Sequence, residues 1–401
     1  MKTQFDFIVV GCGIVGASTA YKLSLKYPDK TIAVFEKEDD VGCHQTGRNS
    51  GVIHSGIYYR PGSLKAENCR KGREQLVNFA QKHKIAHRLC GKIIVAVEEN
   101  ELAVLDKIFG NGLKNQTPGI RYLDQHEIEE KEPFIAGAKA IWVPTAGIID
   151  YVGVVRKCIE LLQKANQENH LFLKTQVKRF QREQDLIVVE TDKGSFKAAK
   201  VVVCGGLQAD RLATMDGLKL DMQIVGFRGD YYELRDEVKY KVNNLIYPVP
   251  DPKYPFLGVH YTPMVNGKVE CGPNAVFTFK REGYDKTSFS FKDSFQALTF
   301  RGTYKLFAKN WIKGLEEYRR AFSKKLFVTE LQRMMPSITE DDVLATRSGV
   351  RAQAVGLHGE MIDDFKVIKN KGVTHVINAP SPAATACLTI ADEIVESMQE
   401  V

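Results

Sequence analysis

The sequence predicts an α/β protein made of two domains, the first of which is assembled from separated segments. A short apolar strand runs directly into a glycine-rich turn and a helix within the first 26 residues. Further apolar strands, ending in glycine or other small residues, lie before residues 205 and 379. Between these pieces are two long insertions with strands and helices of their own. A chain of 401 residues is long enough for two hydrophobic cores.

The first element is the apolar strand Phe5–Val10, which is followed at once by a Gly-x-Gly-x-x-Gly motif. A helix is expected over about 17–26, then a second strand over 31–35 that ends at Glu36. In this motif the glycines allow a tight turn, a close approach of the backbone to a pyrophosphate, and close packing of helix on strand. The helix N-terminus offers N–H groups to the phosphates, and Glu36 is placed to bind a ribose hydroxyl. The predicted contacts are Gly11, Gly13, Ile14, Val15, Gly16, Glu36 and Lys37.

The motif predicts a dinucleotide, and Glu36 argues against NADP because its carboxylate would repel the 2′-phosphate. The next segment distinguishes FAD from NAD. Residues 43–51 are polar and glycine-rich, whereas an NAD dehydrogenase would continue directly into further strands and helices. Such a loop is typical of flavoproteins, where it wraps the pyrophosphate and reaches the flavin; a solvent-exposed linker is the alternative. The predicted FAD contacts here are Thr46, Arg48, Asn49, Ser50 and Gly51.

The rest of the FAD-binding domain is expected further along the chain, where strands are predicted over 171–177, 186–190, 198–204 and 373–378. The last strand leads through a turn of small residues into a helix over about 386–399. A strand, a small-residue turn and a helix N-terminus in this order suit docking of an anion or a flavin oxygen. Val177 is expected to hold the adenine through its backbone, or else to be a core residue. The other predicted contacts are Gly205, Gly206, Ser381, Pro382, Ala383, Ala384 and Thr385.

The complete prediction is a discontinuous Rossmann-like FAD-binding domain joined to an α+β substrate domain that is built on a mixed or antiparallel sheet. The first domain is assigned to residues 1–84, 150–225 and 345–401, and the second to 85–149 and 226–344. The substrate domain is expected to cover the flavin face. Its predicted strands are 90–97, 229–234, 256–261 and 268–271, and its helical region is 294–331.

The composition excludes several classes of protein. With 56 basic and 49 acidic residues the formal net charge is +7, which suits an anionic cofactor and substrate or loose contact with an acidic membrane surface. No nucleic-acid-binding motif is present. No apolar run approaches the roughly 18–20 residues that cross a bilayer. The eight cysteines are scattered without zinc-ligand spacing, so we expect no metal and a reducing, cytoplasmic location, with peripheral contact to the inner membrane left open.

Longer blocks of the sequence resemble a known family. They are HQTGRNSGVIHSGIYY at 44–59, PGSLKA at 61–66, GFRGDYYEL at 226–234, YPVPDPKYPFLGVHYT at 247–262, GPNAVFTFKREGY at 272–284, GVRAQAV at 349–355 and NAPSPAATA at 378–386. These blocks resemble those of the L-2-hydroxyglutarate oxidases and dehydrogenases, FAD enzymes of the wider D-amino-acid-oxidase and glycerol-3-phosphate-dehydrogenase superfamily. The resemblance extends from residue 5 to residue 390.

The resemblance implies non-covalent FAD and oxidation of L-2-hydroxyglutarate, a 2-hydroxy dicarboxylate, to 2-oxoglutarate. Hydride would pass from C2 to flavin N5, and the electrons would continue to oxygen or a membrane quinone. One departure from the family pattern is visible. Relatives commonly carry an arginine just after the His-x-Thr motif, where this chain has Pro263-Met264. If that arginine holds a carboxylate in the relatives, the substrate of this chain is open to question.

Such a reaction needs a base for the hydroxyl proton and fixed cations for the carboxylates. His54 and His260 are the two candidate bases, since an imidazole titrates near neutral pH; each has a purely structural role as its alternative. Arg351 is the preferred catalytic cation because it follows a glycine in an apolar segment. The predicted substrate contacts are Tyr59, Arg228, Tyr247, His260, Lys280, Arg281 and Arg351.

Related chemistries remain as alternatives, because one fold hosts many reactions. An amino-acid or amine oxidase and a glycerol-3-phosphate dehydrogenase are the nearest of these. An FAD-dependent RNA-modifying protein is more remote, since the chain has neither a basic stripe nor a catalytic cysteine loop.

Overall fold

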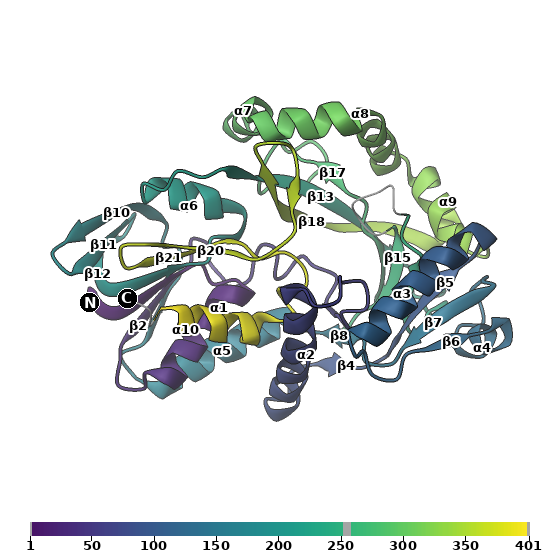
Figure 1. Ribbon diagram of the computed structural model, residues 1–401, viewed down its shortest axis with the longest axis horizontal. Coiled ribbons are helices and arrows are strands. Elements are labelled where there is room, and N and C mark those ends of the chain that lie inside the picture. Colours follow the sequence, from purple (N-terminus) through teal and green to yellow (C-terminus); the bar gives the residue numbers. More distant parts are fainter. Residues whose placement is uncertain (1, 252–257, 399–401) are drawn as a thin grey trace.

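The computed structural model describes residues 2–251 and 258–398. Figure 1 shows two large sheets, each with its own helices, placed next to each other. The first sheet has eight strands and the second has ten. This is the predicted α/β architecture with a second, sheet-based unit.

The first sheet contains the nucleotide-binding elements. Its strands are β1 (Gln4–Val10), β2 (Ile32–Phe35), β9 (His170–Phe172), β10 (Val177–Glu183), β11 (Leu186–Thr191), β12 (Gly194–Val203), β20 (Lys366–Asn370) and β21 (Val373–Asn378). Strands β9, β2, β1, β12 and β21 run parallel to their neighbours in that order, and the hairpins β10–β11 and β20–β21 add antiparallel strands. The carboxyl ends of the parallel strands therefore meet at one edge, where α/β proteins bind their ligands.

Four helices pack on one face of this sheet: α1 (Ile14–Lys26), α2 (Leu64–Lys82), α5 (Tyr151–Ala165) and α10 (Cys387–Ser397). Their apolar residues share one core with the inward side chains of β1 and β2. The side chains of Ser63 and Asp150 cap α2 and α5 by accepting backbone N–H groups. Aromatic residues of β2, β9 and β12 fill a second core on the other face, and α6 (Ala209–Met215) follows the carboxyl end of β12.

The second sheet is mixed. Its strands are β5 (Lys92–Ala96), β6 (Arg121–Leu123), β7 (Lys139–Val143), β13 (Met222–Leu234), β14 (Leu245–Pro248), β15 (His260–Pro263), β16 (Val269–Gly272), β17 (Val276–Phe277), β18 (Val343–Gly356) and β19 (Met361–Ile362). Only the pair β14–β5 is parallel among the pairs described. The long strands β13 and β18 pair along most of their length and place Phe227 opposite Arg351.

Helices α7 (Phe291–Thr299), α8 (Arg301–Phe322) and α9 (Lys324–Met334) lie along the upper edge of this unit in Figure 1, and α3 (Leu102–Lys114) and α4 (Gln125–Lys131) lie near β5–β7. A third, small sheet is formed by β3 (Val52–Ile53), β8 (Gly147–Ile149) and β4 (His87–Arg88). None of the helices within 2–251 and 258–398 is both long and apolar enough to cross a bilayer.

Most predicted elements are confirmed, and four differ in their extent. The predicted strand over 171–177 is wrong: the chain turns at Lys174, whose φ is +52°, and so separates β9 from β10. The predicted helical region 294–331 is three helices, broken at Phe300 and Ser323. Of the predicted strand 256–261, residues 256 and 257 lie outside the described residues, and β15 begins only at His260. The predicted helix over 386–399 begins at Cys387, and its last residue is also outside the described part.

The sheets also divide the chain differently from the predicted boundary at residue 345. Strand β18 pairs with β13 and so belongs to the second sheet, although 345–356 was assigned to the FAD-binding domain. Its burial follows no simple alternation, which is why the sequence pattern hides it. Strand β13 likewise starts at Met222, before the predicted boundary at 226. The division into two domains itself stays a prediction.

Candidate active site and cofactor cavity

A cavity of about 1800 Å³ extends from the carboxyl edge of the first sheet to the second sheet. Most of the predicted site residues line it. They are Gly11, Gly13, Ile14, Val15, Gly16, Glu36, Lys37, Thr46, Arg48, Asn49, Ser50, His54, Tyr59, Val177, Gly205, Gly206, Tyr247, His260, Arg281, Arg351, Ser381, Pro382, Ala383 and Ala384. The structure therefore brings predicted cofactor contacts and predicted substrate contacts to the same cavity. Gly51, Arg228, Lys280 and Thr385 do not line it.

The glycine turn leaves room for a ligand at its middle position only. A Cβ atom at Gly11 would lie 2.4 Å from the carbonyl oxygen of Cys204, and one at Gly16 would lie 2.0 Å from that of Gly11. At Gly13 the nearest atom would be Thr46 Oγ1 at 3.4 Å, so the backbone there is open to the cavity. Helix α1 begins directly after Gly13 and has no side-chain cap from it. The arrangement fits a pyrophosphate against backbone N–H groups.

Glu36 lies at the end of β2 and is almost completely buried. One carboxylate oxygen accepts a hydrogen bond from the Cys12 N–H at 2.8 Å, and the other accepts one from the Glu38 N–H at 3.1 Å. These bonds hold the carboxylate at the cavity wall with acceptor capacity left over. Thr175 and Val177 line the same end, which fits the ribose and adenine of a dinucleotide.

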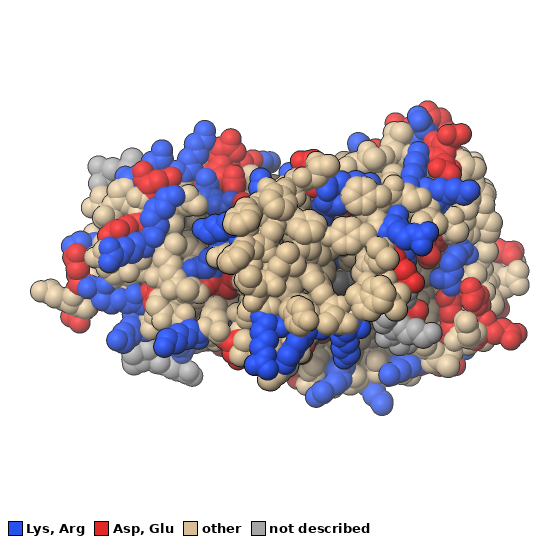
Figure 2. Space-filling view, turned by 90° about the horizontal axis from the view of Figure 1, so that it is seen from above, with Lys and Arg blue, Asp and Glu red and all other residues tan. Residues whose placement is uncertain are grey.

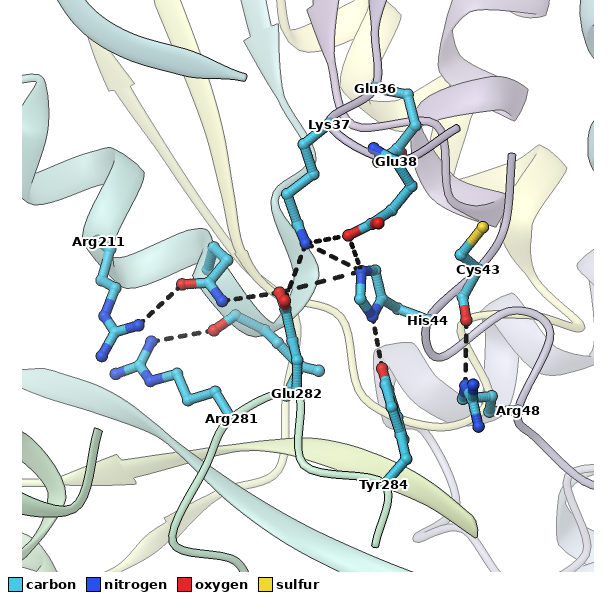
Figure 3. Close-up of polar contacts among 12 residues, drawn as sticks. Glu36, Lys37, Glu38, Cys43, His44, Arg48, Arg211, Arg281, Glu282 and Tyr284 are labelled. Atoms are coloured by element: carbon cyan, nitrogen blue, oxygen red, sulfur yellow. Dashed lines mark hydrogen bonds and ion pairs between the residues drawn. The ribbon is translucent and has the colours of Figure 1, made fainter. Parts of the chain in front are cut away.

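A polar cluster joins the nucleotide-binding unit to the segment after β17 (Figure 3). The ammonium of Lys37 lies 2.9 Å from a carboxylate oxygen of Glu282 and 3.0 Å from His44 Nε2, and it also contacts Glu38. Glu38, His44 and Glu282 have the spacing of a metal site. The Lys37 ammonium contacts all three side chains and offsets one of the two carboxylate charges.

The loop 43–51 is held from both units. The Arg48 guanidinium stacks 3.8 Å from the centre of the Tyr284 ring and donates to the carbonyl of Cys43 at 3.2 Å. Asn49 donates to the Thr46 carbonyl at 2.8 Å, which closes the loop on itself. This is a folded cavity wall, so the alternative of a solvent-exposed linker is wrong.

The two candidate bases lie at the other end of the cavity. His260 is 5% exposed and stacks on the Tyr247 ring, with centres 3.9 Å apart. Its Nδ1 faces the carbonyl of Gly258 at 2.9 Å, which leaves Nε2 as the acceptor nitrogen. Burial, with a further contribution from Lys92, lowers the pKa of His260 to about 3; burial followed by Lys92 and His260 lowers the pKa of His54 to about 3. Both imidazoles are therefore neutral near pH 7.

The turn that follows β21 contacts His54 through a hydrogen bond. The His54 N–H donates to Thr385 Oγ1 at 3.1 Å, and the Tyr151 hydroxyl bonds to the same oxygen at 2.9 Å. Thr385 thus supports the turn from behind the cavity wall. Pro382 lies five residues before α10 begins, so it belongs to the turn and is not the first residue of the helix.

The predicted cations differ in their surroundings. Arg351 is enclosed and donates to the Asn274 carbonyl at 3.1 Å, and burial lowers its pKa. Arg228 instead lies 2.8 Å from Asp230, and Arg281 lies 2.7 Å from Asp210, in buried ion pairs that take up their charge. Lys280 is exposed away from the cavity. Of these four, Arg281 and Arg351 line the cavity, and the guanidinium of Arg281 is held in the ion pair with Asp210.

Sequence reasoning missed Lys92. Its side chain is 1% exposed, and its ammonium lies 4.7 Å from the Tyr58 ring centre and 4.6 Å from that of Tyr247. Burial lowers the pKa of Lys92 to about 8. The available signal was a lysine at the first position of the apolar strand β5, because a lysine is rarely buried completely unless it has a partner.

The departure from the family pattern lies at the end of β15. A Cβ atom at Gly51 would lie 3.6 Å from Met264 Cε, so this side chain packs beside the loop 43–51. Neither Pro263 nor Met264 lines the cavity.

Comparisons with known proteins agree with this arrangement. The family described as FAD dependent oxidoreductase matches residues 6–397. The L-2-hydroxyglutarate dehydrogenase of Indibacter alkaliphilus is 43% identical over 394 residues, covering 98% of each chain. The mitochondrial L-2-hydroxyglutarate dehydrogenase of Homo sapiens is 40% identical over 415 residues, covering 99% of this chain and 89% of the human one.

Solved structures show the same fold. L-alpha-glycerophosphate oxidase from Mycoplasma pneumoniae with FAD bound superposes with a TM-score of 0.80 at 22% identity, over 99% of this chain and 95% of the other. Glycine oxidase from Geobacillus kaustophilus gives a TM-score of 0.75 at 16% identity, over 99% and 95% of the two chains. The chain therefore belongs to the FAD-dependent oxidoreductase family and, within it, to the L-2-hydroxyglutarate dehydrogenases.

Proposed function

We propose that the chain oxidises L-2-hydroxyglutarate to 2-oxoglutarate. The observation that carries this is the composition of the cavity, which has a dinucleotide cradle at one end and two neutral imidazoles beside a buried guanidinium at the other. The names of relatives with 40–43% identity support the choice of substrate.

Bound FAD would supply the acceptor for the hydride that leaves C2. The turn Gly11–Gly16 would hold the pyrophosphate and Glu36 the ribose. The loop 43–51 and the turn 378–385 would hold the flavin end. No side chain is expected to bond to the flavin covalently.

The chain itself supplies the base. As the C2–H bond breaks, the hydroxyl proton passes to a histidine nitrogen and the C2–O single bond becomes a carbonyl. His260 is oriented for this by the contact of its Nδ1 with Gly258, which leaves Nε2 free to accept. The contact described for the His54 ring is longer, since its Nε2 lies 3.5 Å from the Ser381 hydroxyl. Either histidine can serve, and the variants discussed below separate them.

Arg351 would bind a substrate carboxylate. A guanidinium has five N–H donors in a planar fork, so the bond to Asn274 is compatible with a two-point contact to a carboxylate. Tyr59 and Tyr247 line the same cavity, and their hydroxyls would donate to substrate oxygens. Enclosure from water strengthens each of these contacts.

Electrons are proposed to leave for oxygen or a membrane quinone. A cytoplasmic location is supported by the eight cysteines, all of which are unpaired. The acceptor is identified by adding first oxygen and then a quinone to the anaerobically reduced protein and following the return of flavin absorbance.

The proposal is tested by anaerobic titration of the yellow protein with L- and D-2-hydroxyglutarate, lactate, malate and glycerol 3-phosphate. We expect L-2-hydroxyglutarate to bleach the flavin at the lowest concentration. If glycerol 3-phosphate or an added amino acid bleaches it more readily, one of the alternative oxidases replaces this proposal. Absence of bleaching by every compound would exclude all of them.

A further inference from the structure

The outer face of α7 and α8 exposes large apolar side chains (Figure 2). We call this the α7–α8 face, and its members are Phe289, Phe291, Phe295, Leu298, Tyr304, Trp311, Ile312, Leu315 and Phe322, each between 46% and 75% exposed. Among the described residues, every exposed phenylalanine and tryptophan lies within 279–322. Contiguous apolar surface of this kind usually marks an interaction site.

These side chains are exposed although the helices are well packed. The opposite side of the helices is buried: Ala297 and Leu306 join a core that includes Phe277. The Tyr318 hydroxyl donates to the Phe277 carbonyl, and the Ser290 side chain caps α7. The exposed aromatics are therefore presented by a fixed scaffold, and the rings of Phe291 and Phe295 stack on each other at 6.0 Å.

The segment that includes this face and the start of α9 is rich in basic residues. Residues 289–326 contain nine basic and three acidic residues, a formal net charge of +6 compared with +7 for the whole chain. Two of the acids face basic partners, since Asp293 lies 2.5 Å from Arg211 and Glu317 lies 3.2 Å from Arg320. Figure 2 shows Lys and Arg around the border of the tan area. The face is thus both apolar and strongly basic.

We propose that the α7–α8 face docks on the surface of an anionic lipid bilayer. Aromatic side chains would enter the headgroup region while lysine and arginine side chains contact lipid phosphates, which is how interfacial amphipathic helices bind. A second copy of the chain fits less well, because a symmetric contact would bring two positively charged faces together. The inference goes beyond the proposed function, on which it rests only in placing the enzyme beside a membrane quinone.

Flotation with vesicles tests the docking. Holoenzyme is mixed with vesicles of phosphatidylcholine, alone or with phosphatidylglycerol, and the bound fraction is measured on a density gradient. We expect binding to the mixed vesicles only, weakened by added salt. The apolar variant F291S/W311S and the charge variant K305Q/K309Q should each lower the partition coefficient by at least about tenfold. The control L25S/L113S removes two equally exposed leucines on α1 and α3, each 57% exposed, and should float like the wild type.

Three outcomes would overturn the proposal. One is equal binding of the wild type to neutral and anionic vesicles, or none to either. A second is that the two α7–α8 variants bind the anionic vesicles as strongly as the control variant does. The third is a dimer in light scattering that F291S/W311S converts to a monomer, which would assign the face to a second copy. Flavin bleaching by L-2-hydroxyglutarate without vesicles is measured separately, so failure of the proposed function and failure of docking are distinguishable.

Discussion

The Lys92 ammonium lies 4.6 Å from the centre of the Tyr247 ring, on which His260 stacks in turn at 3.9 Å. The ring of Tyr58 flanks the ammonium at 4.7 Å. Among the described residues no carboxylate pairs with Lys92, so two aromatic faces are its main electrostatic partners. Burial lowers the pKa of both His54 and His260, and the neighbouring charge of Lys92 lowers it further.

Replacing Lys92 with methionine should move the acid limb of kcat/KM to higher pH. The substitution keeps the apolar length of the side chain but removes the charge that opposes protonation of the histidines. Because the pKa of Lys92 is about 8, its effect should be present below that pH and fade above it. The measurement is a pH profile of kcat/KM on flavin-loaded protein.

Two variants separate this electrostatic role from a structural one. Lys92→Arg retains the charge and should restore the wild-type acid limb. Lys131→Met removes an ammonium 4.3 Å from the Trp142 ring, outside the cavity, and should leave the profile unchanged. An acid limb that does not move in Lys92→Met would remove Lys92 from any role in setting the histidine pKa.

The variants His54→Gln and His260→Gln identify the base. The variant that lacks it should lose about 10²–10⁴-fold in kcat. The other should retain most of its turnover. Both are measured at equal FAD content, judged from the absorbance spectrum. Wild-type kcat in both would show that neither histidine is the base.

The buried His260 should also make the fold sensitive to acid. Burial lowers its pKa in the folded state to about 3, whereas an unfolded chain has an ordinary imidazole pKa of about 6.5. The unfolded state therefore binds the extra proton as pH falls from 6.5 towards 3, and stability is lost over that window. Between pH 7 and pH 5 this costs about 2 kcal/mol. The measurement is the free energy of unfolding in urea at pH 7 and at pH 5. Between these values it should fall by about 2 kcal/mol less in His260→Gln than in the wild type. In His126→Gln, on the exposed surface of α4, it should fall as much as in the wild type.

Removing the guanidinium of Arg351 should reduce kcat/KM for L-2-hydroxyglutarate by about 100-fold, because a buried charge-assisted contact to a carboxylate is lost. Arg351→Lys should recover only part of this, since an ammonium lacks the planar fork. Lys280→Ala is the matched control, for its side chain is exposed away from the cavity. Unchanged kinetics in Arg351→Ala would exclude it from the substrate site.

The sequence predicted the parts of the site that depend on local spacing. The turn Gly11–Gly16 and Glu36 could be assigned because the motif, the helix and the next strand follow one another within 36 residues. The sequence predicts Arg281 as a cation for the substrate, and nothing local indicates its pairing with Asp210, which lies 71 residues away in the chain. Lys92 was missed because its position between the rings of Tyr58 and Tyr247 arises only in the tertiary fold.

The close contact between Gly11 and Cys204 gives a test of the cofactor cradle itself. Gly11 has a φ of +93°, and a Cβ atom there would lie 2.4 Å from the Cys204 carbonyl oxygen, so alanine would push β1 and β12 apart at the pyrophosphate. We expect Gly11→Ala to be purified without flavin absorbance. Gly217 is a matched control: its φ is +85°, but no atom lies within 4 Å of an added Cβ. Gly217→Ala should lose only about 1–2 kcal/mol of stability from the left-handed backbone and should keep its FAD. Full FAD occupancy in Gly11→Ala would place the pyrophosphate elsewhere in the cavity.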